Sequence, residues 1–332
     1  MKRIPTLDGW RGIAILLVMI AHTQDSMLGY FIGGNAWMDV GQHGVNIFFV
    51  LSGYLITSLL LEEEKVNLRR FYLRRFFRLM PCAWTYLAFL GVLSLLIRQR
   101  LIGSDLWPCL FFFRNYLPAV ETPANTLSLH FWSLSVEEQF YMAWPPLLLL
   151  AGRKWGLSIV TAGALACAAF RLINWNSYNN FPSCLHTEVR VDALLAGCAL
   201  AFLMRYDPVR EWIRRHGAKL FLLCLPAFLW HMYRFQLLIP LTESLLIALM
   251  IACTSVNPKS IPSRVLEWQH LKTTGIISYS IYVWQQVFLR SFWGPLGFPL
   301  LCIASIGSWI LIEQPCIRLG RRLEQRISEG NL

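Results

Sequence analysis

Two polar side chains share one face of the first apolar segment, which is predicted to span residues 9–28. Arg11 and His22 lie eleven residues apart. Eleven helical steps of 100° end about 20° beyond three full turns, so both side chains project from one side. An arginine binds phosphate oxygens as a planar fork, and a histidine exchanges protons near neutral pH. Taken singly, Arg11 also fits a surface anchor and His22 a helix–helix hydrogen bond.

Two adjacent carboxylates lie in the apolar segment predicted over 130–150. The side chains of Glu137 and Glu138 diverge by about 100°, so at most one of them faces His22. Glu137 is predicted at roughly the depth of His22, where a carboxylate would orient an imidazole during proton transfer. A structural salt bridge to an arginine is the alternative. We interpret His22, Arg11 and Glu137 as the catalytic candidates, since charged groups inside a bilayer are costly and usually functional.

Several other segments place polar groups at a comparable depth. Their convergence on one level is harder to attribute to packing than any single residue. The substrate-binding candidates are Trp132, Glu138, Arg190, Asp192 and Gln285.

A cationic run lies between the second and third apolar segments. Residues 62–78 are predicted to form an amphipathic interfacial helix, on which Arg75 and Arg78 share a face. With Arg11, these side chains could hold the polyphosphate of acyl-coenzyme A, the predicted donor substrate. Topology and attraction to anionic membrane lipid offer an alternative explanation. No tightly bound cofactor is predicted, and no metal, because the nine cysteines show no metal-ligand spacing.

Composition places all of these residues in a membrane. Only 15% of the 332 residues are charged, against about a quarter in a soluble domain, and the mean hydropathy is +0.47. Runs of about 18 or more apolar residues recur, each long enough to cross a hydrocarbon layer. We predict an all-α, polytopic integral membrane protein of about ten transmembrane helices, forming one domain over 1–332 with no appended soluble domain. The predicted spans are 9–28, 43–61, 79–97, 130–150, 157–173, 188–204, 219–233, 237–255, 274–293 and 297–315.

The net charge of +11 is distributed unevenly along the chain. Most lysines and arginines fall in the termini and loops that the predicted spans place on one and the same side of the membrane. By the positive-inside rule this side is the cytoplasm, so both termini are predicted to be cytoplasmic. The basic excess therefore requires no nucleic acid partner. A homo-oligomer is left open by the sequence.

These motifs, in this order, resemble the membrane acyltransferase-3 family. The most specific of them is FWSLSVEEQFY at 131–141. The resemblance covers essentially the whole chain and is carried by residues 7–14, 44–56, 74–81, 131–141, 190–192, 277–284 and 313–315.

The resemblance implies an enzyme of the bacterial cytoplasmic membrane that takes an acyl group, usually acetyl, from cytoplasmic acyl-coenzyme A. The group would pass to a hydroxyl of a carbohydrate acceptor such as a surface polysaccharide. It also implies that His22 is catalytic, that Arg11 is essential, and that Arg75 and Arg78 lie on the nucleotide side. One position departs from the family pattern, because Gln285 stands where a histidine is common. Glutamine takes no proton near neutral pH, so we expect this residue to orient substrate.

Two other functions stay open at this point. A transporter or flippase for a lipid-linked sugar would use the same intramembrane polar groups and would move substrate without consuming acyl-coenzyme A. A non-catalytic receptor or scaffold would tolerate replacement of His22 and Glu137. The sequence does not separate direct acyl transfer from an acyl-His22 intermediate, and it names neither the acceptor nor the acyl chain.

Overall fold

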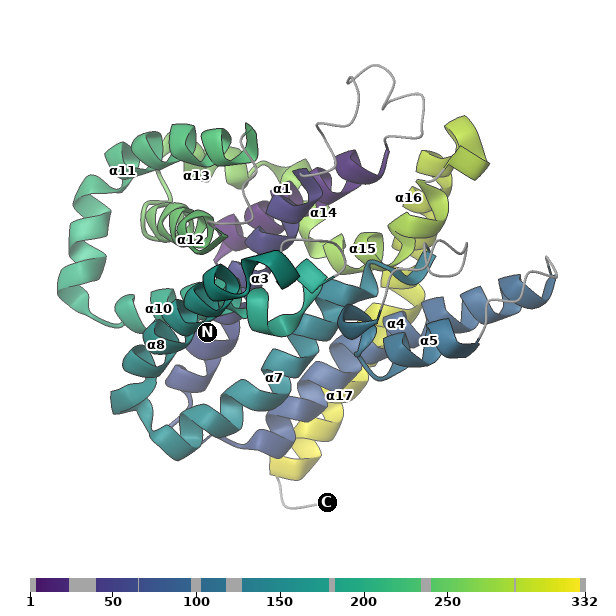
Figure 1. Ribbon diagram of the computed structural model, residues 1–332, viewed down its shortest axis with the longest axis horizontal. Coiled ribbons are helices and arrows are strands. Elements are labelled where there is room, and N and C mark those ends of the chain that lie inside the picture. Colours follow the sequence, from purple (N-terminus) through teal and green to yellow (C-terminus); the bar gives the residue numbers. More distant parts are fainter. Residues whose placement is uncertain are drawn as a thin grey trace.

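The computed structural model describes residues 4–23, 40–64, 66–96, 103–117, 127–178, 183–233, 240–289 and 291–328, and all regular secondary structure within them is helical (Figure 1). The α-helices are α1 (Pro5–His22), α3 (Val40–Glu62), α4 (Leu68–Leu96), α5 (Gly103–Leu110), α7 (Phe131–Ala151), α8 (Arg153–Ile173), α9 (Trp175–Tyr178), α10 (Val191–Leu203), α11 (Asp207–Tyr233), α12 (Pro240–Val256), α13 (Ile261–Leu266), α14 (Gln269–Ile276), α15 (Ser278–Phe288), α16 (Gly297–Ser308) and α17 (Gln314–Ser328). Single turns of 3-10 helix are η2 (Arg114–Tyr116), η3 (Ser183–Leu185) and η4 (Thr187–Val189), with a longer η5 (Ser291–Leu296), and η6 (Trp309–Glu313) is π-helical.

Within the part of the chain that the structure describes, four helical segments are long and apolar enough to cross a bilayer. They are Val40–Glu62, Leu68–Leu96, Arg153–Ile173 and the run Trp293–Arg326, which passes through α16, η6 and α17. The chain is thus an all-α integral membrane protein, as its composition predicts. Each predicted span overlaps a helix at least in part. The total of about ten spans and the side of the termini stay predictions.

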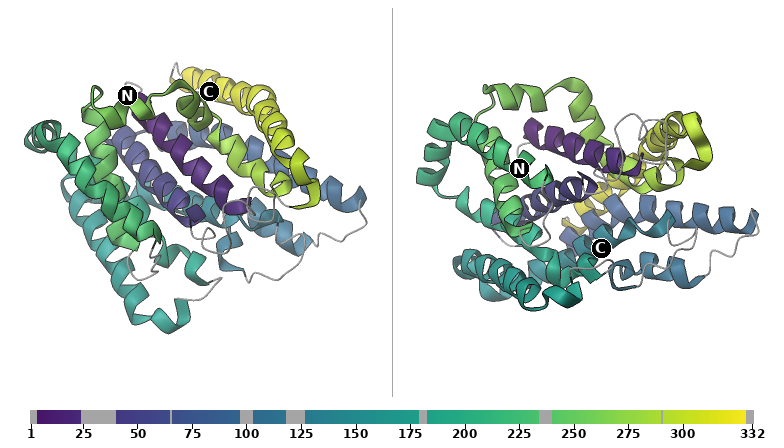
Figure 2. Two further views of the ribbon diagram at one scale, coloured as in Figure 1. Left: turned by 90° about the horizontal axis from the view of Figure 1, so that it is seen from above. Right: turned by 45° about the horizontal axis from the view of Figure 1, so that its top comes forward.

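Helix α1 lies in the interior of the helical bundle. It packs against α3, α14 and α15, and Figure 2 shows it (purple) between these neighbours. Pro5 begins the helix at a position where its missing N–H costs no hydrogen bond. Glycine allows close approach on the α14 side, since a Cβ on Gly275 would lie 1.8 Å from the carbonyl oxygen of Asp8. This packing encloses most of the helix that carries Arg11 and His22, and both of these side chains are half-buried.

Helices α3 and α10 cross at a pair of glycines. A Cβ on Gly53 would lie 1.9 Å from the carbonyl oxygen of Leu194, and one on Gly197 would lie 2.1 Å from that of Val50. Small residues at such crossings let two backbones touch where lipid provides no hydrophobic driving force. The crossing fixes α3, whose other faces line the candidate site.

The basic segment differs from the sequence prediction. Among the described residues, the segment predicted over 62–78 is not a helix of its own: α3 ends at Glu62, and α4 runs from Leu68 to Leu96. The arginines form the first turns of this long helix. Some of them pair with carboxylates of the protein itself, as Arg74 does with Glu63 and Glu324.

The predicted ninth and tenth spans also differ in detail. Residues 274–293 do not form one helix, because α14 ends at Ile276 and α15 begins at Ser278. The tenth helix, predicted over 297–315, instead continues through the π-helical turn of η6 into α17. Hydropathy detects an apolar run but does not register where its backbone changes direction.

Candidate functional site

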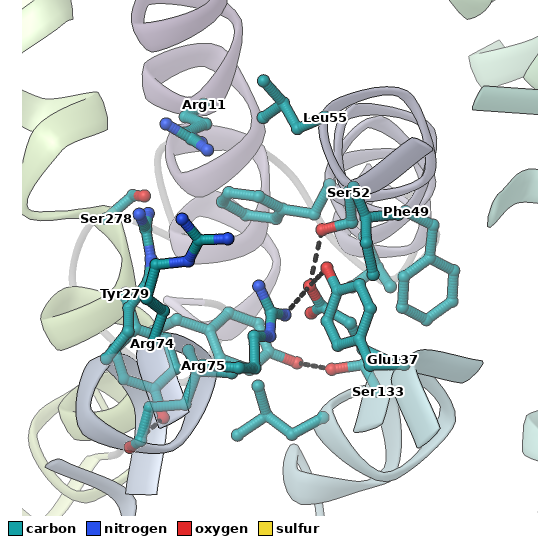
Figure 3. Close-up of a pocket in the computed structure, with 18 of the residues that line it drawn as sticks. Arg11, Phe49, Ser52, Leu55, Arg74, Arg75, Ser133, Glu137, Ser278 and Tyr279 are labelled. Atoms are coloured by element: carbon teal, nitrogen blue, oxygen red, sulfur yellow. Dashed lines mark hydrogen bonds and ion pairs between the residues drawn. The ribbon is translucent and has the colours of Figure 1, made fainter. Parts of the chain in front are cut away.

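A cavity of about 360 Å³ opens among α1, α3, α4, α7 and α15, and we term it the arginine cavity (Figure 3). Part of its wall is apolar, and the rest carries arginines, hydroxyl groups and one carboxylate. The polar lining residues are Arg11, Arg74, Arg75, Arg78, Ser52, Ser133, Glu137, Tyr141, Ser278, Tyr279 and Tyr282. The apolar ones are Val45, Phe48, Phe49, Leu55, Ile56, Leu59, Phe71, Leu79 and Leu134.

The four arginines of the cavity differ in their partners. Arg74 pairs with Glu63 at 2.8 Å and with Glu324 at 3.0 Å, and Arg11 pairs with Asp8 one turn earlier at 3.2 Å. Arg75 is also paired, as described below. Arg78 is exposed to the cavity and makes no hydrogen bond or ion pair with any residue that the structure describes. It is therefore the cation most open to an anionic ligand.

The carboxylate of Glu137 is the centre of a hydrogen-bond network on the cavity wall. It accepts hydrogen bonds from Ser52 at 2.5 Å, from Arg75 at 2.8 Å and from the hydroxyl of Tyr141; Figure 3 marks the first two with dashed lines. The Arg75 guanidinium also lies 3.4 Å from the centroid of the Tyr141 ring and 3.5 Å from Glu138. Arg75 is thus held by two carboxylates and an aromatic face, which fixes its planar group against α7.

The π-helical turn brings a further carboxylate toward the arginines. Glu313 is buried in η6 and accepts a hydrogen bond from Ser280 of α15 at 2.9 Å. It lies within electrostatic range of Arg78 and Arg11 without pairing to either. An extra residue in a helical turn redirects side chains, and π-helical turns are frequent at functional sites. Glu313 thus lies near the arginines of the cavity and forms no ion pair with Arg78.

One boundary of the arginine cavity is a short chain of hydroxyl groups. Ser133 and Tyr282 both line the cavity, and their oxygens lie 2.5 Å apart. The Tyr282 hydroxyl donates to the backbone carbonyl of His130 at 3.0 Å. The cavity is therefore connected, by one hydrogen-bonded tyrosine, to the start of α7.

The ring orientation of His22 is set by its own helix. Its Nδ1–H donates to the carbonyl of Val18 at 2.8 Å, because a carbonyl oxygen can only accept. In the neutral imidazole the lone pair then belongs to Nε2, which is the arrangement that a general base or nucleophile needs. His22 is half-buried and lies outside the lining of the arginine cavity.

The predicted contact between Glu137 and His22 is absent from this structure. The hydrogen bonds of Glu137 go to α3, α4 and its own helix, as given above. A guanidinium is a stronger partner for a carboxylate than a neutral imidazole, and Arg75 lies within reach. The catalytic role of Glu137 stays a prediction, but it would act on the cavity and not on the histidine ring.

Trp132 and Arg190 lie behind the wall of the cavity. The Arg190 guanidinium is 5.1 Å from the Trp132 ring centroid and donates to Gln42. Trp132 contacts Phe49, which does line the cavity, edge to face at 6.1 Å. Both predicted substrate-binding residues are buried and support the site from behind.

Asp192 belongs to a separate set of buried charges. Its carboxylate pairs with Arg171 at 2.6 Å, joining α10 to α8. Nearby along α3, His43 and Asn46 both contact the carboxylate of Glu243 on α12, at 2.7 and 3.0 Å. We term these five residues the ion-pair cluster. Arg190 and Asp192 are two residues apart in sequence but have different partners.

Gln285 is fully buried, and neither its amide nitrogen nor its amide oxygen has a hydrogen-bond partner among the described residues. It does not line the arginine cavity. Among the described residues, no group of three or more histidine, cysteine or acidic side chains could hold a metal ion.

Sequence reasoning missed several cavity residues. Tyr141 could have been found, since it lies one turn after Glu137 on the same face of α7. Ser52 and Tyr282 gave no such signal, because their partners are far away in the sequence. Four of the predicted site residues line the wall of the cavity: Arg11, Arg75, Arg78 and Glu137.

The fold and the cavity define a helical membrane protein with a cationic site between its helices. More particularly, the chain belongs to the acyltransferase family whose domain model matches residues 4–313. The predicted resemblance is confirmed, and so is the prediction of an acyltransferase at the level of this family.

Curated relatives carry related names. Peptidoglycan O-acetyltransferase OatA of Listeria monocytogenes is 29% identical over 94% of this chain and 53% of its own length. The putative peptidoglycan O-acetyltransferase YrhL of Bacillus subtilis is 29% identical over 97% of this chain and 56% of its own length. A putative O-acetyltransferase of Staphylococcus aureus strain COL is 31% identical over 86% of this chain and 50% of its own length. The chain spans about half the length of these relatives, and no solved structure matches it significantly.

Proposed function

We propose that this protein transfers an acetyl group from acyl-coenzyme A to a hydroxyl of a carbohydrate acceptor in the bacterial cytoplasmic membrane. Its relatives are named for peptidoglycan as the acceptor and name no donor. Peptidoglycan is therefore the first acceptor to examine, with other surface polysaccharides after it.

The observation that carries the donor assignment is the open Arg78 in a cavity with three further arginines. A polyphosphate needs several cationic forks, and its attached acyl arm needs an apolar channel. The arginine cavity offers both, with the apolar side chains of α3 facing the basic turns of α4. In this proposal Arg78 and Arg11 bind phosphate oxygens, while Arg75 stays fixed by Glu137 and Tyr141.

The acceptor chemistry is assigned to His22. Its Nε2 lone pair takes the proton of the acceptor hydroxyl while that oxygen attacks the acyl carbonyl carbon. A C–O ester bond forms, the thioester C–S bond breaks, and the departing thiolate takes up a proton. The hydrogen bond from Nδ1–H to Val18 holds the ring in the tautomer that this step requires.

A covalent route uses the same lone pair. Nε2 would attack the thioester first, and the acyl group would pass from His22 to the acceptor in a second step. A trapped acyl-His22 adduct supports this route, whereas kinetics that require donor and acceptor to bind together support direct transfer.

The test compares ester content of purified cell-wall glycan, by NMR, in cells carrying the wild-type gene, His22→Ala or no copy. We expect acetyl esters only in cells that carry the wild-type gene. The wild-type and His22→Ala proteins must be present in the membrane in equal amounts. Ester content that is the same in all three cell lines would remove the proposal and favour movement of a sugar without acyl transfer.

A further inference from the structure

A second histidine lies beside the proposed reaction centre and has no role in the mechanism above. His130 immediately precedes α7 and is only 3% exposed. Three aromatic rings surround it, with centroid distances of 5.0 Å to Phe131, 5.4 Å to Tyr86 and 5.6 Å to Tyr282. An imidazole so enclosed by apolar rings is held in a fixed position.

The hydrogen bonds of His130 determine which of its nitrogens carries the proton. Nε2 lies 3.1 Å from the carbonyl oxygen of Val283, so it must be the donor. Nδ1 of the neutral ring therefore carries a lone pair. This atom is buried and has no hydrogen-bond partner among the residues that the structure describes. Burial of an acceptor without a donor is unfavourable, so a donor that reaches this atom during function would be stabilised by it.

The fold places His130 next to the wall of the arginine cavity and close enough to His22 for the two rings to interact electrostatically. His130 is bonded to α15 through Val283 and Tyr282, and α15 packs directly against α1, which ends in His22. A charge on His22 is felt at His130. Glu137, the partner first expected for His22, is occupied elsewhere by Arg75.

We propose that His130 is a positioning residue for His22. Once Nε2 of His22 has taken the proton of the acceptor hydroxyl, Nδ1 of His130 accepts a hydrogen bond from that N–H, either directly or through one water. The proton stays on His22 until the thiolate leaves, and His130 neither gains nor loses one. This inference rests on the proposed function and assigns to a neutral imidazole the role of a carboxylate in other catalytic pairs.

Two substitutions separate this role from a purely structural one. In His130→Asn the side-chain oxygen lies near the former Nδ1 and keeps the acceptor, but the donor to Val283 is lost. In His130→Gln the amide nitrogen reaches the position of Nε2 and keeps that donor, but no acceptor remains at Nδ1. The two roles therefore predict opposite orders of activity.

The experiment measures the initial rate of ester formation on cell-wall glycan in cells without the gene, resupplied with wild type, His22→Ala, His130→Asn or His130→Gln. Rates are divided by the amount of folded protein, taken from size-exclusion chromatography in detergent. We expect His130→Asn to stay within a few-fold of wild type and His130→Gln to fall about 10- to 100-fold, the usual effect of losing a hydrogen bond to a charged group.

The possible outcomes are distinct. A rate for His130→Gln equal to or above that of His130→Asn overturns the proposal and leaves His130 a structural contact to α15. Equal losses in both variants overturn it as well. A wild type that makes no more ester than cells without the gene contradicts the proposed function itself, which the two variants alone would not do.

Discussion

The arginine cavity and the ion-pair cluster treat charge in different ways. In the cluster, the residues Arg171, Asp192 and Glu243 are at most 4% exposed, and each has a close polar partner. In the cavity, Arg78 is exposed and has no hydrogen bond or ion pair with the described residues. Both regions join several helices by polar contacts. The contrast is that each charged group of the cluster has a charged or polar partner, whereas Arg78 of the cavity has none among the described residues.

The difference indicates what each region does. A charge buried in a membrane protein must be paired, and a complete pair holds its two helices in register. An open arginine beside other arginines suffers repulsion, which an anionic ligand relieves. We therefore infer that the cluster maintains the fold and that the cavity binds the donor.

The largest effect is expected where a buried pair is broken. Arg171→Met leaves Asp192 as an uncompensated buried charge, which typically costs about 3–5 kcal/mol. We expect a clear fall in the thermal unfolding midpoint of the purified protein in detergent, and less folded protein in the membrane.

The control is the double variant Arg171→Met with Asp192→Asn, which removes both charges. It should recover a large part of the lost stability, because replacing a complete buried pair is often nearly neutral. An unfolding midpoint for Arg171→Met that equals the wild-type value would show that the cluster does not hold α8 to α10, and the contrast between the two regions would fail.

Much of the fold was predictable because bilayer thickness dictates helix length. The span predicted over 43–61 is α3 (Val40–Glu62), and that over 130–150 is α7 (Phe131–Ala151). The break between α14 and α15 at Ile277 could not be predicted, and neither could the contact of the neighbouring Gly275 with the backbone of Asp8 on a distant helix. Hydropathy contains no information about such contacts.

The candidate site was predictable in its residue types but not in its pairings. The positions of Arg11, Arg75 and Arg78 could be predicted from helical spacing and the basic run, and all three line the cavity. The partner of Asp192 could not be predicted, because the nearby Arg190 is as good a candidate as Arg171 until the packing of the helices is known. Pairing depends on tertiary structure, and several arginines compete for each carboxylate.

An intermediate effect is expected at the open cation. Arg78→Gln removes a charged fork from the proposed donor site, and a hydrogen bond to a charged group contributes about 1.5–3 kcal/mol. We expect KM for acetyl-coenzyme A to rise about 10- to 100-fold, with an unchanged unfolding midpoint because the side chain has no hydrogen-bond or ion-pair partner to lose among the described residues.

Arg69→Gln is the matched control for this variant. Arg69 lies on the same helix, is exposed, and does not line the cavity, so the change in net charge is identical. Its KM should stay close to the wild-type value. Similar increases in KM for both variants would show that the overall positive field attracts the donor and that Arg78 has no specific contact with it.

The smallest effect is expected at Tyr141. Tyr141→Phe removes the hydroxyl that donates to Glu137 but keeps the ring against Arg75. Ser52 and Arg75 still hold the carboxylate, so the loss should be about 0.5–1.5 kcal/mol, or roughly tenfold at most, in kcat/KM for acetyl-coenzyme A. Tyr141→Leu, which also removes the aromatic face, should lose more. If Tyr141→Phe instead abolished transfer as completely as His22→Ala, its hydroxyl would have to contact the reacting atoms. The Glu137 network would then belong to the chemistry itself, and the cavity could no longer be described as a site that only binds the donor.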